Sequence, residues 1–301
     1  PRRKPTPLPQ FKSSSYELPE PYGVVLIMAP WNYPYLLSLD PLFGAVAAGN
    51  CVVLKPSQYT PLTAYILAEL IDEAGYPAGV FNLVTGCGPE VGNALALHPD
   101  VRMLSFTGST AAGREVARLA LSNIKRIALE LGGKSAAILL PGGDWEFGVK
   151  AVMDTVVLNA GQTCNALTRL LVPAAEQEKA NEIILNTLKQ YKKGSNADPE
   201  SDIGPLSSRR QFDRVKKYIQ IGIDEGATLL CGGLPGQDAE YRIDPTVFVN
   251  VKPGMRIEKE EIFGPVLVVV PYETVDDAVR IANDSEYGLA GAVFGPEAEA
   301  N

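Results

Sequence analysis

The sequence predicts an α/β protein built on a doubly wound parallel sheet, and three observations indicate this fold class. Short apolar runs alternate with longer helical patterns through the first half of the chain, at the spacing of β-α-β units. The apolar runs are too short for helices and suit strands that are buried on both faces. Glycine or proline follows each run closely, where a turn can begin.

The first segment, residues 1–21, is rich in proline and has little periodic apolar content. We expect an extended arm there that serves as an oligomer contact, because it has too little apolar surface to fold back and pair alone. The first buried strand is predicted at residues 24–28, and Ala29-Pro30 follows it and ends it. A polar loop over residues 31–34 follows it.

Helical patterns and strands then alternate along the chain. In the first half we expect helices at 36–48, 61–75, 89–97 and 111–122, and strands at 51–55, 80–84 and 103–106. In the second half we expect helices at 174–193 and 207–225, strands at 170–173 and 227–231, and an apolar run at 266–270. The order predicts a parallel doubly wound sheet in the first half.

Ligands of such sheets bind beyond the carboxyl ends of the strands. Four predicted strand ends carry polar or glycine residues, namely Asn32, Lys55, Gly86 with Gly88, and Gly108 with Ser109. A Gly-Ser-Thr turn before a helix aims backbone amides at a phosphate. Two of these features have a plain structural alternative, since Ser109 or Thr110 suits a helix cap and Lys55 a solvated lysine. Their coincidence on one edge favours a nucleotide site.

The candidate nucleophile is Cys164, which follows a glycine-containing polar turn that can present a side chain to a cleft. Catalytic cysteines are usually activated by histidine, but the chain has a single histidine, His98. It precedes Pro99 at the end of a helical pattern, a position typical of a helix terminus. This disfavours a Cys-His hydrolase. Activation of Cys164 then requires backbone dipoles, a carboxylate or a cationic cofactor.

Two acidic positions are also candidates. Glu130 lies in an apolar run directly before Gly132-Gly133, so we expect partial burial, which raises a carboxyl pKa toward that of a general base. The alternative is a buried acid that caps the glycine turn. Glu260-Glu261 precedes Phe263-Gly264-Pro265. An acid pair is normally solvated, but this pattern predicts a structured loop that turns one acid and the ring into the same cleft.

Composition narrows the class of protein. A net charge of −8 with one basic cluster, Arg2-Arg3-Lys4, argues against nucleic-acid binding. No apolar run approaches the roughly 20 residues of a membrane span, and the first residues lack a signal-peptide core, so we expect no membrane partner and a cytoplasmic location. The four cysteines form no C-x-x-C pair, so we expect free thiols and no metal site.

Six motifs, which occur over about residues 20–295, together resemble those of the NAD(P)-dependent aldehyde dehydrogenase superfamily, in that family's order. They are Pro30-Trp31-Asn32-Tyr33-Pro34, Lys55-Pro56-Ser57, Phe106-Thr107-Gly108-Ser109-Thr110, Glu130-Leu131-Gly132-Gly133-Lys134, Gly161-Gln162-Thr163-Cys164 and Glu261-Ile262-Phe263-Gly264-Pro265. The resemblance implies three domains: an arm at 1–21, an NAD(P)-binding domain at 22–133 and an α/β catalytic domain at 134–301. Family chains extend further at both ends, so we expect both domains to be incomplete.

The resemblance also implies roles for particular residues. Cys164 is the nucleophile, Glu130 the general base and Asn32 an oxyanion donor. Lys55 binds the adenosine ribose, Gly108 and Ser109 the pyrophosphate, and Glu261 with Phe263 the nicotinamide riboside. The remaining implied cofactor contacts are Ile27, Trp31, Gln58, Gly86, Gly88 and Leu131.

The implied reaction oxidises an aldehyde to a carboxylic acid through a thiohemiacetal and a thioester on the cysteine. Family members that transfer the acyl group to coenzyme A lack a glutamate at the position of Glu130. The presence of Glu130 therefore favours a carboxylate product. NAD-preferring members commonly carry Glu at the position of Gln58. We therefore expect use of both NAD and NADP, with NAD preferred, and a homo-oligomer. The alternatives are a cysteine-dependent thioesterase or hydrolase, and an inactive binding fragment on the same scaffold.

Overall fold

The computed structural model describes residues 2–5, 13–236 and 239–300. The chain divides into two compact units, Pro1–Glu130 and Leu131–Asn301. Among the described residues, no helix is long and apolar enough to cross a membrane.

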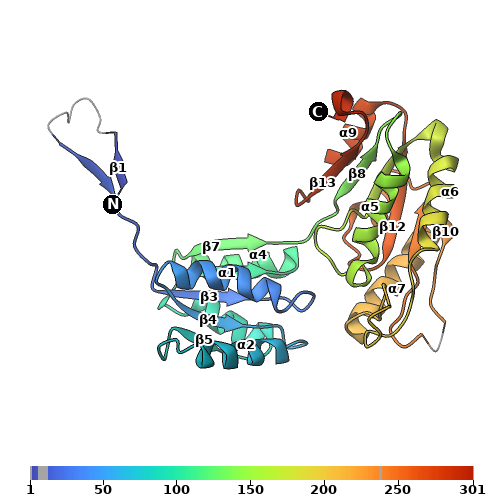
Figure 1. Cartoon of the computed structure of the whole chain (residues 1–301). Coiled ribbons are helices and arrows are strands. Elements are labelled where there is room, and N and C mark those ends of the chain that lie inside the picture. The colour runs from blue at the N-terminus through green and yellow to red at the C-terminus, as the bar shows by residue number, and fades with distance from the viewer. Residues whose placement is uncertain (1, 6–12, 237–238, 301) are drawn as a thin grey trace. The chain divides into compact units, whose positions relative to one another are not determined.

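The first unit contains a five-stranded parallel sheet in the order β5-β4-β3-β6-β7 (Figure 1). The strands are β3 (Val24–Met28), β4 (Cys51–Lys55), β5 (Phe81–Leu83), β6 (Val101–Thr107) and β7 (Arg126–Glu130). The chain enters at β3, adds β4 and β5 on one side, and then returns to add β6 and β7 on the other. The strand order therefore reverses between β3 and β6, and such a reversal is where open parallel sheets bind their ligands.

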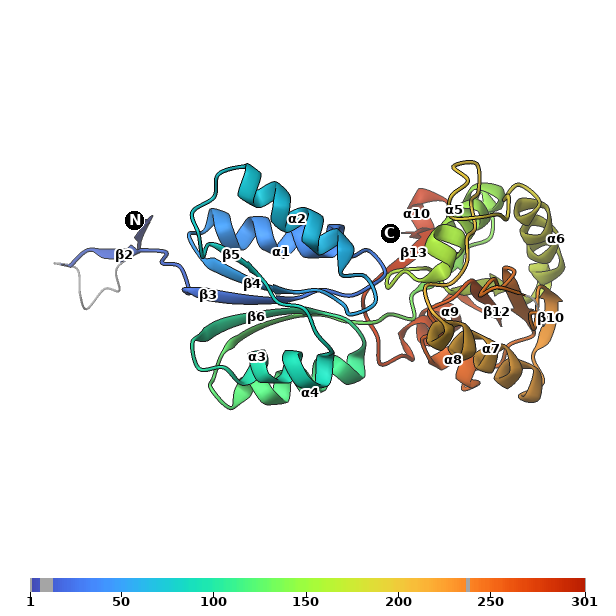
Figure 2. The same cartoon turned by 90° about the horizontal axis from the view of Figure 1, so that it is seen from below.

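Helices cover both faces of this sheet. They are α1 (Leu36–Ala47), α2 (Leu62–Glu73), the π-helical turn η2 (Gly88–Gly92), α3 (Asn93–Leu97) and α4 (Thr110–Leu121). Figure 2 shows α1 and α2 on one face and α3 and α4 on the other. The predicted doubly wound α/β arrangement is confirmed, and the predicted helix at 89–97 begins as the π-helical turn. His98 is the C-cap of α3, as its position before proline predicts.

The arm differs from its prediction. Strands β1 (Arg2–Lys4) and β2 (Ser15–Glu17) pair with each other in an antiparallel register, so the expectation that this segment cannot pair alone is wrong. Backbone hydrogen bonds and the ion pair between Lys4 and Glu17, at 2.7 Å, supply what apolar burial does not. Most of the described residues in these two strands are exposed.

The second unit has a six-stranded sheet in the order β10-β11-β12-β9-β8-β13. Its strands are β8 (Ala136–Leu139), β9 (Arg169–Pro173), β10 (Thr228–Cys231), β11 (Thr246–Val249), β12 (Val266–Tyr272) and β13 (Gly291–Phe294). All neighbours are parallel except β10 and β11. This mixed sheet gives the unit its α/β class.

The helices of the second unit are α5 (Trp145–Val157), α6 (Gln177–Leu188), α7 (Arg209–Asp224), α8 (Arg256–Lys259), α9 (Val275–Asn283) and α10 (Glu297–Ala300), with 3-10 turns η3 (Leu158–Gly161) and η4 (Ala174–Glu176). Figure 2 shows α5 and α6 on one face and α7, α8 and α9 on the other. The predicted helix at 174–193 is shorter than expected, because its first residues form η4 and α6 ends at Leu188.

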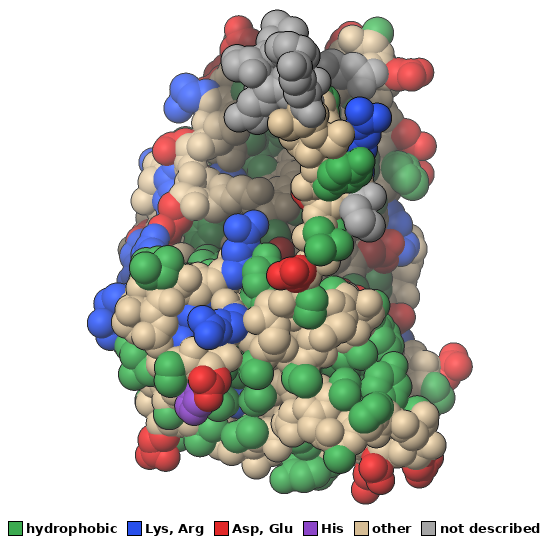
Figure 3. Space-filling model, turned by 90° about the vertical axis from the view of Figure 1, so that its left-hand side faces the viewer, with side chains coloured by type: hydrophobic (Ala, Val, Ile, Leu, Met, Phe, Trp, Pro, Cys, Tyr) green, Lys and Arg blue, Asp and Glu red, His purple; other side chains and the backbone are tan. Residues whose placement is uncertain are grey.

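The two units bury apolar surface to different extents. In the second unit β8, β9, β11 and β12 are buried almost throughout. In the first unit, helix α2 leaves a stripe of apolar side chains exposed at helical spacing, namely Leu62, Tyr65, Ile66 and Leu70. Figure 3 shows hydrophobic side chains spread over the surface of the molecule in a view from the side of the first unit.

Candidate active site

The carboxyl edge of the first sheet gathers most of the predicted cofactor residues. Because the five strands are parallel, their carboxyl ends meet at one edge. In register along that edge, Met28 of β3 lies between Lys55 of β4 and Phe106 of β6, and Thr107 pairs with Glu130 of β7. Ile27 is buried within β3. The half-buried Trp31 and Asn32 follow β3 directly.

Lys55 is buried rather than solvated, so the solvated-lysine alternative is wrong. Its Nζ donates to the carbonyl oxygens of Pro56 at 2.8 Å and Gly86 at 3.1 Å, which ties the ends of β4 and β5 together. Burial lowers the pKa of Lys55, and nearby Cys87 opposes the shift. The ammonium is thus held at the strand edge, within reach of the turn that Gly86 and Gly88 begin.

The turn after β6 is a helix start. Ser109 is the N-cap of α4, and its hydroxyl accepts from Ala112 N at 3.3 Å, as the structural alternative predicts. The N–H of Gly108 donates to the Glu130 carbonyl at 3.0 Å, so it is not available to a phosphate. A Cβ at Gly108 would lie 2.7 Å from the Phe106 ring. A phosphate at this turn would therefore rest on the first-turn amides of α4.

Glu130 is exposed at the end of β7, and the prediction that it is partly buried is wrong. The apolar run around it suggested burial, but β7 is the edge strand of the five-stranded sheet and is exposed along most of its length. Gln58 is likewise exposed, just beyond β4. A base that must reach water or substrate does not need burial, so the role implied for Glu130 stays a prediction.

In the second unit, Cys164 belongs to a loop with an unusual backbone. Asn159, Ala160 and Gly161 all have positive φ, of 51°, 53° and 72°. A Cβ at Gly161 would lie 2.2 Å from the carbonyl carbon of Gly264, so only glycine allows this contact. Cys164 is half-buried at the end of the loop. The loop is thereby seated on the segment that carries Glu261 and Phe263.

Buried Gln162 braces the same loop from two sides. Its Nε2 donates to the Asn159 carbonyl at 2.8 Å and its Oε1 accepts from Ser207 N at 3.0 Å. The Cys164 carbonyl also lies 2.5 Å from where a Cβ of Gly133 would stand. The glycines around the nucleophile candidate therefore permit close backbone approach.

The acid that caps the glycine turn is Glu261. Its Oε1 accepts from Gly133 N at 3.1 Å, and a Cβ at Gly132 would lie 2.5 Å from its Oε2. Burial raises the pKa of Glu261, while the Gly133 N–H, Arg214 and Lys134 oppose the shift. The sequence indicated a capped glycine turn but suggested Glu130 as the acid, because the partner lies 128 residues away.

As expected, the two acids of the Glu260-Glu261 pair have different surroundings. Glu260 ion-pairs with Arg256 at 2.7 Å, which holds the pKa of Glu260 down at about 2. Glu261 is thus the acid that turns inward. Phe263 is half-buried with a positive φ of 65°, and Leu131, at the start of the unit, is half-buried.

Sequence reasoning missed a group of buried charges beneath the turn. Arg169 donates to the Lys134 carbonyl at 2.8 Å and to Glu258 at 3.0 Å, and all three side chains are buried. Lys134 Nζ has no hydrogen-bond partner among the described residues. Burial and the charge of Arg169 lower the pKa of Lys134 to about 7. A charged residue at the start of the apolar run Leu170 to Val172 was the signal available.

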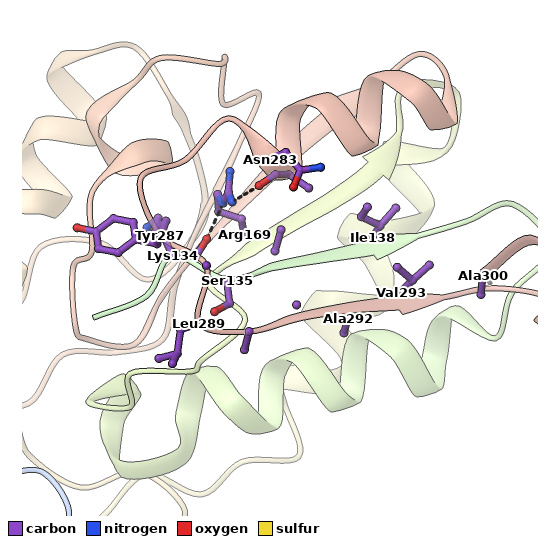
Figure 4. Close-up of a pocket in the computed structure, with 15 residues that line it drawn as sticks. Lys134, Ser135, Ile138, Arg169, Asn283, Tyr287, Leu289, Ala292, Val293 and Ala300 are labelled. Carbon is purple, nitrogen blue, oxygen red and sulfur yellow. Dashed lines mark hydrogen bonds between the residues drawn. The ribbon is translucent and has the colours of Figure 1, made fainter. Parts of the chain in front are cut away.

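A cavity of about 620 Å³ lies beside these charges (Figure 4). Lys134, Ser135, Arg169 and Tyr287 group at one end of it, while Ile138 and Val293 line it further along β8 and β13. Its lining includes Leu289, whose Cβ lies 3.3 Å from where a Cβ of Gly133 would stand. The cavity therefore adjoins the glycine turn on which Glu261 sits.

Comparison with known proteins places these features in context. The sequence profile of the aldehyde dehydrogenase family matches residues 3–300. The chain is 47% identical over 277 residues to 3-succinoylsemialdehyde-pyridine dehydrogenase from Pseudomonas sp, covering 91% of this chain and 58% of that protein. The chain thus spans under two thirds of the length of this relative.

Solved structures agree. The crystal structure of aldehyde dehydrogenase C from Pseudomonas syringae, a cysteine-to-alanine mutant in complex with NAD+ and octanal, is similar with a TM-score of 0.90 and 44% identity, over 93% of this chain and 58% of that one. An aldehyde dehydrogenase from Mycobacterium tuberculosis in complex with NAD+ is similar with a TM-score of 0.90 and 45% identity, with the same coverages. These comparisons do not support the hydrolase or inactive-fragment alternatives.

Proposed function

The chain belongs to the aldehyde dehydrogenase family, and from that membership we propose that the protein that contains it oxidises an aldehyde to a carboxylic acid with NAD. The observation that carries the proposal is the packing of the Cys164 loop against the Glu261–Phe263 loop through Gly161 and Gly264. This contact joins the loop that carries the half-buried Cys164 to the loop that carries the half-buried Glu261, and an enzyme with a cysteine nucleophile and a ribose-containing cofactor needs two such groups on adjoining loops.

The residues present fit a dinucleotide. In the first unit the strand order reverses between β3 and β6, and the N-terminus of α4 follows β6, where it can hold a pyrophosphate. In the second unit the inward carboxylate of Glu261 can accept hydrogen bonds from ribose hydroxyls. We propose that Lys55 binds the adenosine ribose, that the turn of Gly108 and Ser109 seats the pyrophosphate on the first-turn amides of α4, and that Glu261 and Phe263 hold the nicotinamide riboside. The remaining proposed cofactor contacts are Ile27, Trp31, Gln58, Gly86, Gly88 and Leu131.

In the proposed reaction, the Cys164 thiolate adds to the aldehyde carbon and the carbonyl oxygen becomes an alkoxide. The Asn32 side-chain amide and the Cys164 N–H stabilise that oxygen, and loss of one such donor costs about 3 kcal/mol. NAD, when bound, supplies the hydride acceptor. An acyl group then remains on Cys164 as a thioester. Glu130 takes a proton from the water that hydrolyses it, which releases the carboxylic acid.

The exposed position of Glu130 agrees with this role, because a deacylating base must meet a water molecule. The chain has no histidine besides His98, whose backbone N–H caps α3 while its Nδ1 accepts a hydrogen bond from Asp100 N. Thiolate formation at Cys164 is therefore proposed to depend on the positive charge of the oxidised nicotinamide ring, since nearby positive charge lowers a thiol pKa.

We also propose that the full-length protein is a cytoplasmic homo-oligomer. Cys51, Cys87 and Cys231 are free thiols, which suits a reducing compartment. The β1–β2 hairpin exposes Tyr16, and the chain just after it exposes Leu18, as expected of an element that contacts another subunit. The domain roles proposed are an oligomer arm at 1–21, a cofactor domain at 22–133 and a catalytic domain at 134–301.

The test is Cys164→Ala in the full-length protein, with Cys231→Ala as the matched control. Cys231 lies on β10 in the same unit, and burial raises the pKa of its thiol, so it is a poor nucleophile. We expect Cys164→Ala to abolish NADH formation from aldehyde while NAD affinity changes less than about twofold, and Cys231→Ala to keep wild-type turnover. Substantial turnover by Cys164→Ala would show that the nucleophile is wrongly assigned.

A further inference from the structure

Three consecutive main-chain carbonyls of the Glu261–Phe263 loop accept hydrogen bonds from one helix, α7. Arg214 donates to the Glu261 carbonyl and, through Nε, to the Ile262 carbonyl at 3.2 Å. Gln211 Nε2 donates to the Phe263 carbonyl. Since Gln211 and Arg214 are three residues apart, they lie on the same face of the helix. The loop is therefore held along its backbone, independently of its side chains.

The helix that supplies these donors is itself well anchored. Ser208 caps its N-terminus and accepts from Gln211 N at 3.3 Å. Val215 and Ile219 are fully buried in the core of the unit. The Arg214 guanidinium also lies over the Tyr218 ring, 5.1 Å from its centroid. Gln211 and Arg214 thus project from a rigid element.

The loop they hold does not have a relaxed backbone. Phe263 has a positive φ of 65°, a conformation that disfavours a side chain with a Cβ and persists only where the surroundings impose it. Gly264, the next residue, is in close contact on two sides. A Cβ there would lie 2.5 Å from Val215 of α7, and the backbone of Gly264 is in turn the surface on which Gly161 of the Cys164 loop rests.

We propose that Gln211 and Arg214 are positioning residues that fix the Glu261–Phe263 loop in its cofactor-binding form. This inference rests on the proposed function, because it assigns the loop to cofactor binding. The carbonyl contacts aim the Glu261 carboxylate at Gly133 N, where it sits at 3.1 Å, and keep Phe263 in its strained conformation. Without them the loop is free to relax, and Glu261 loses its fixed place before any cofactor arrives.

The chain offers a matched control on the same helix. Arg209 is an exposed arginine in the first turn of α7 that pairs with Asp213 at 3.0 Å. An exposed i,i+4 pair contributes little to stability. Arg209→Ala therefore removes the same side chain as Arg214→Ala, from the same helix, without touching the loop carbonyls.

The experiment compares Arg214→Ala, Gln211→Ala, Arg214→Lys and Arg209→Ala in the full-length protein. The first readout is amide hydrogen exchange without cofactor, in peptides that contain Gly133 and residues 259–264. We expect exchange to rise by about tenfold or more in Arg214→Ala and Gln211→Ala. Arg214→Lys, which keeps the charge but has one donor nitrogen in place of the guanidinium fork, should be intermediate, and Arg209→Ala should match wild type.

The second readout is direct titration with NAD+. We expect affinity to fall by about tenfold in Arg214→Ala and by less than twofold in Arg209→Ala, with the KM for aldehyde unchanged in both. If Arg214→Ala and Arg209→Ala agree in exchange and in NAD+ affinity, the proposal is wrong. A wild-type protein that forms no NADH and binds no NAD+ would overturn the proposed function instead, while the exchange data would still report on the loop.

Discussion

The two units position their candidate site residues by different physical means. In the first unit, regular parallel strands bring Lys55, Gly108 and Glu130 to one sheet edge, and the residues need only stand at strand ends. In the second unit, Cys164 and Glu261 lie on irregular loops with positive φ at non-glycine residues. Those loops are held by glycine contacts and by side-chain donors from α7. A site built on strands tolerates local change, whereas a site built on loops depends on particular neighbours.

The two units also differ in the charged side chains that they bury. The second unit encloses Arg169, Glu258 and Lys134 beneath its loops, and breaking a buried ion pair by removing one partner typically costs about 3–5 kcal/mol. In the first unit, the buried charge at the sheet edge is Lys55, which carbonyl oxygens satisfy. The second unit therefore depends on a buried ion pair, Arg169 with Glu258, of which both partners must be present.

A pair of glycine substitutions tests this division most strongly. Gly161→Ala places a Cβ 2.2 Å from the Gly264 backbone at a residue with a φ of 72°, whereas Gly88→Ala meets no atom within 4 Å. We expect Gly161→Ala to lower the free energy of unfolding by roughly 3 kcal/mol and Gly88→Ala to change it by less than about 0.5 kcal/mol. Chemical denaturation of the full-length variants measures both. Equal effects from the two substitutions would remove the distinction between the units.

A smaller effect is expected at Gln58, which should alter cofactor choice and nothing else. Gln58 is exposed just beyond the strand that ends at Lys55. A carboxylate there repels a 2′-phosphate, and such a repulsion at a partly solvated site amounts to roughly 1–2 kcal/mol. We expect Gln58→Glu to raise the preference for NAD over NADP by about tenfold, with unfolding unchanged. The measurement is kcat/KM for NAD and for NADP, before and after the substitution. If the ratio of the two values does not change, position 58 does not face the ribose.

The sequence predicts the first unit better than the second for the same physical reason. Strand ends and the Ser109 cap follow from local patterns, so the sheet edge could be predicted. The exposure of Glu130 could not, because nothing local shows that β7 is an edge strand. The hydrogen bond between Glu261 and Gly133 and those between Arg214 and the loop carbonyls could not be predicted either, because they join residues far apart in the chain. Periodicity carries no information about such partners.

The central claim is that Cys164 carries the acyl group that Glu130 helps to release, and Glu130→Gln tests it most directly. The full-length variant is mixed with aldehyde and NAD+, quenched in acid within milliseconds to seconds, digested, and analysed by mass spectrometry. We expect a burst of about one NADH per active site, turnover slowed by about 100-fold or more, and the acyl mass on the peptide that contains Cys164. A uniformly slow first turnover with no acyl group on Cys164 would contradict the account.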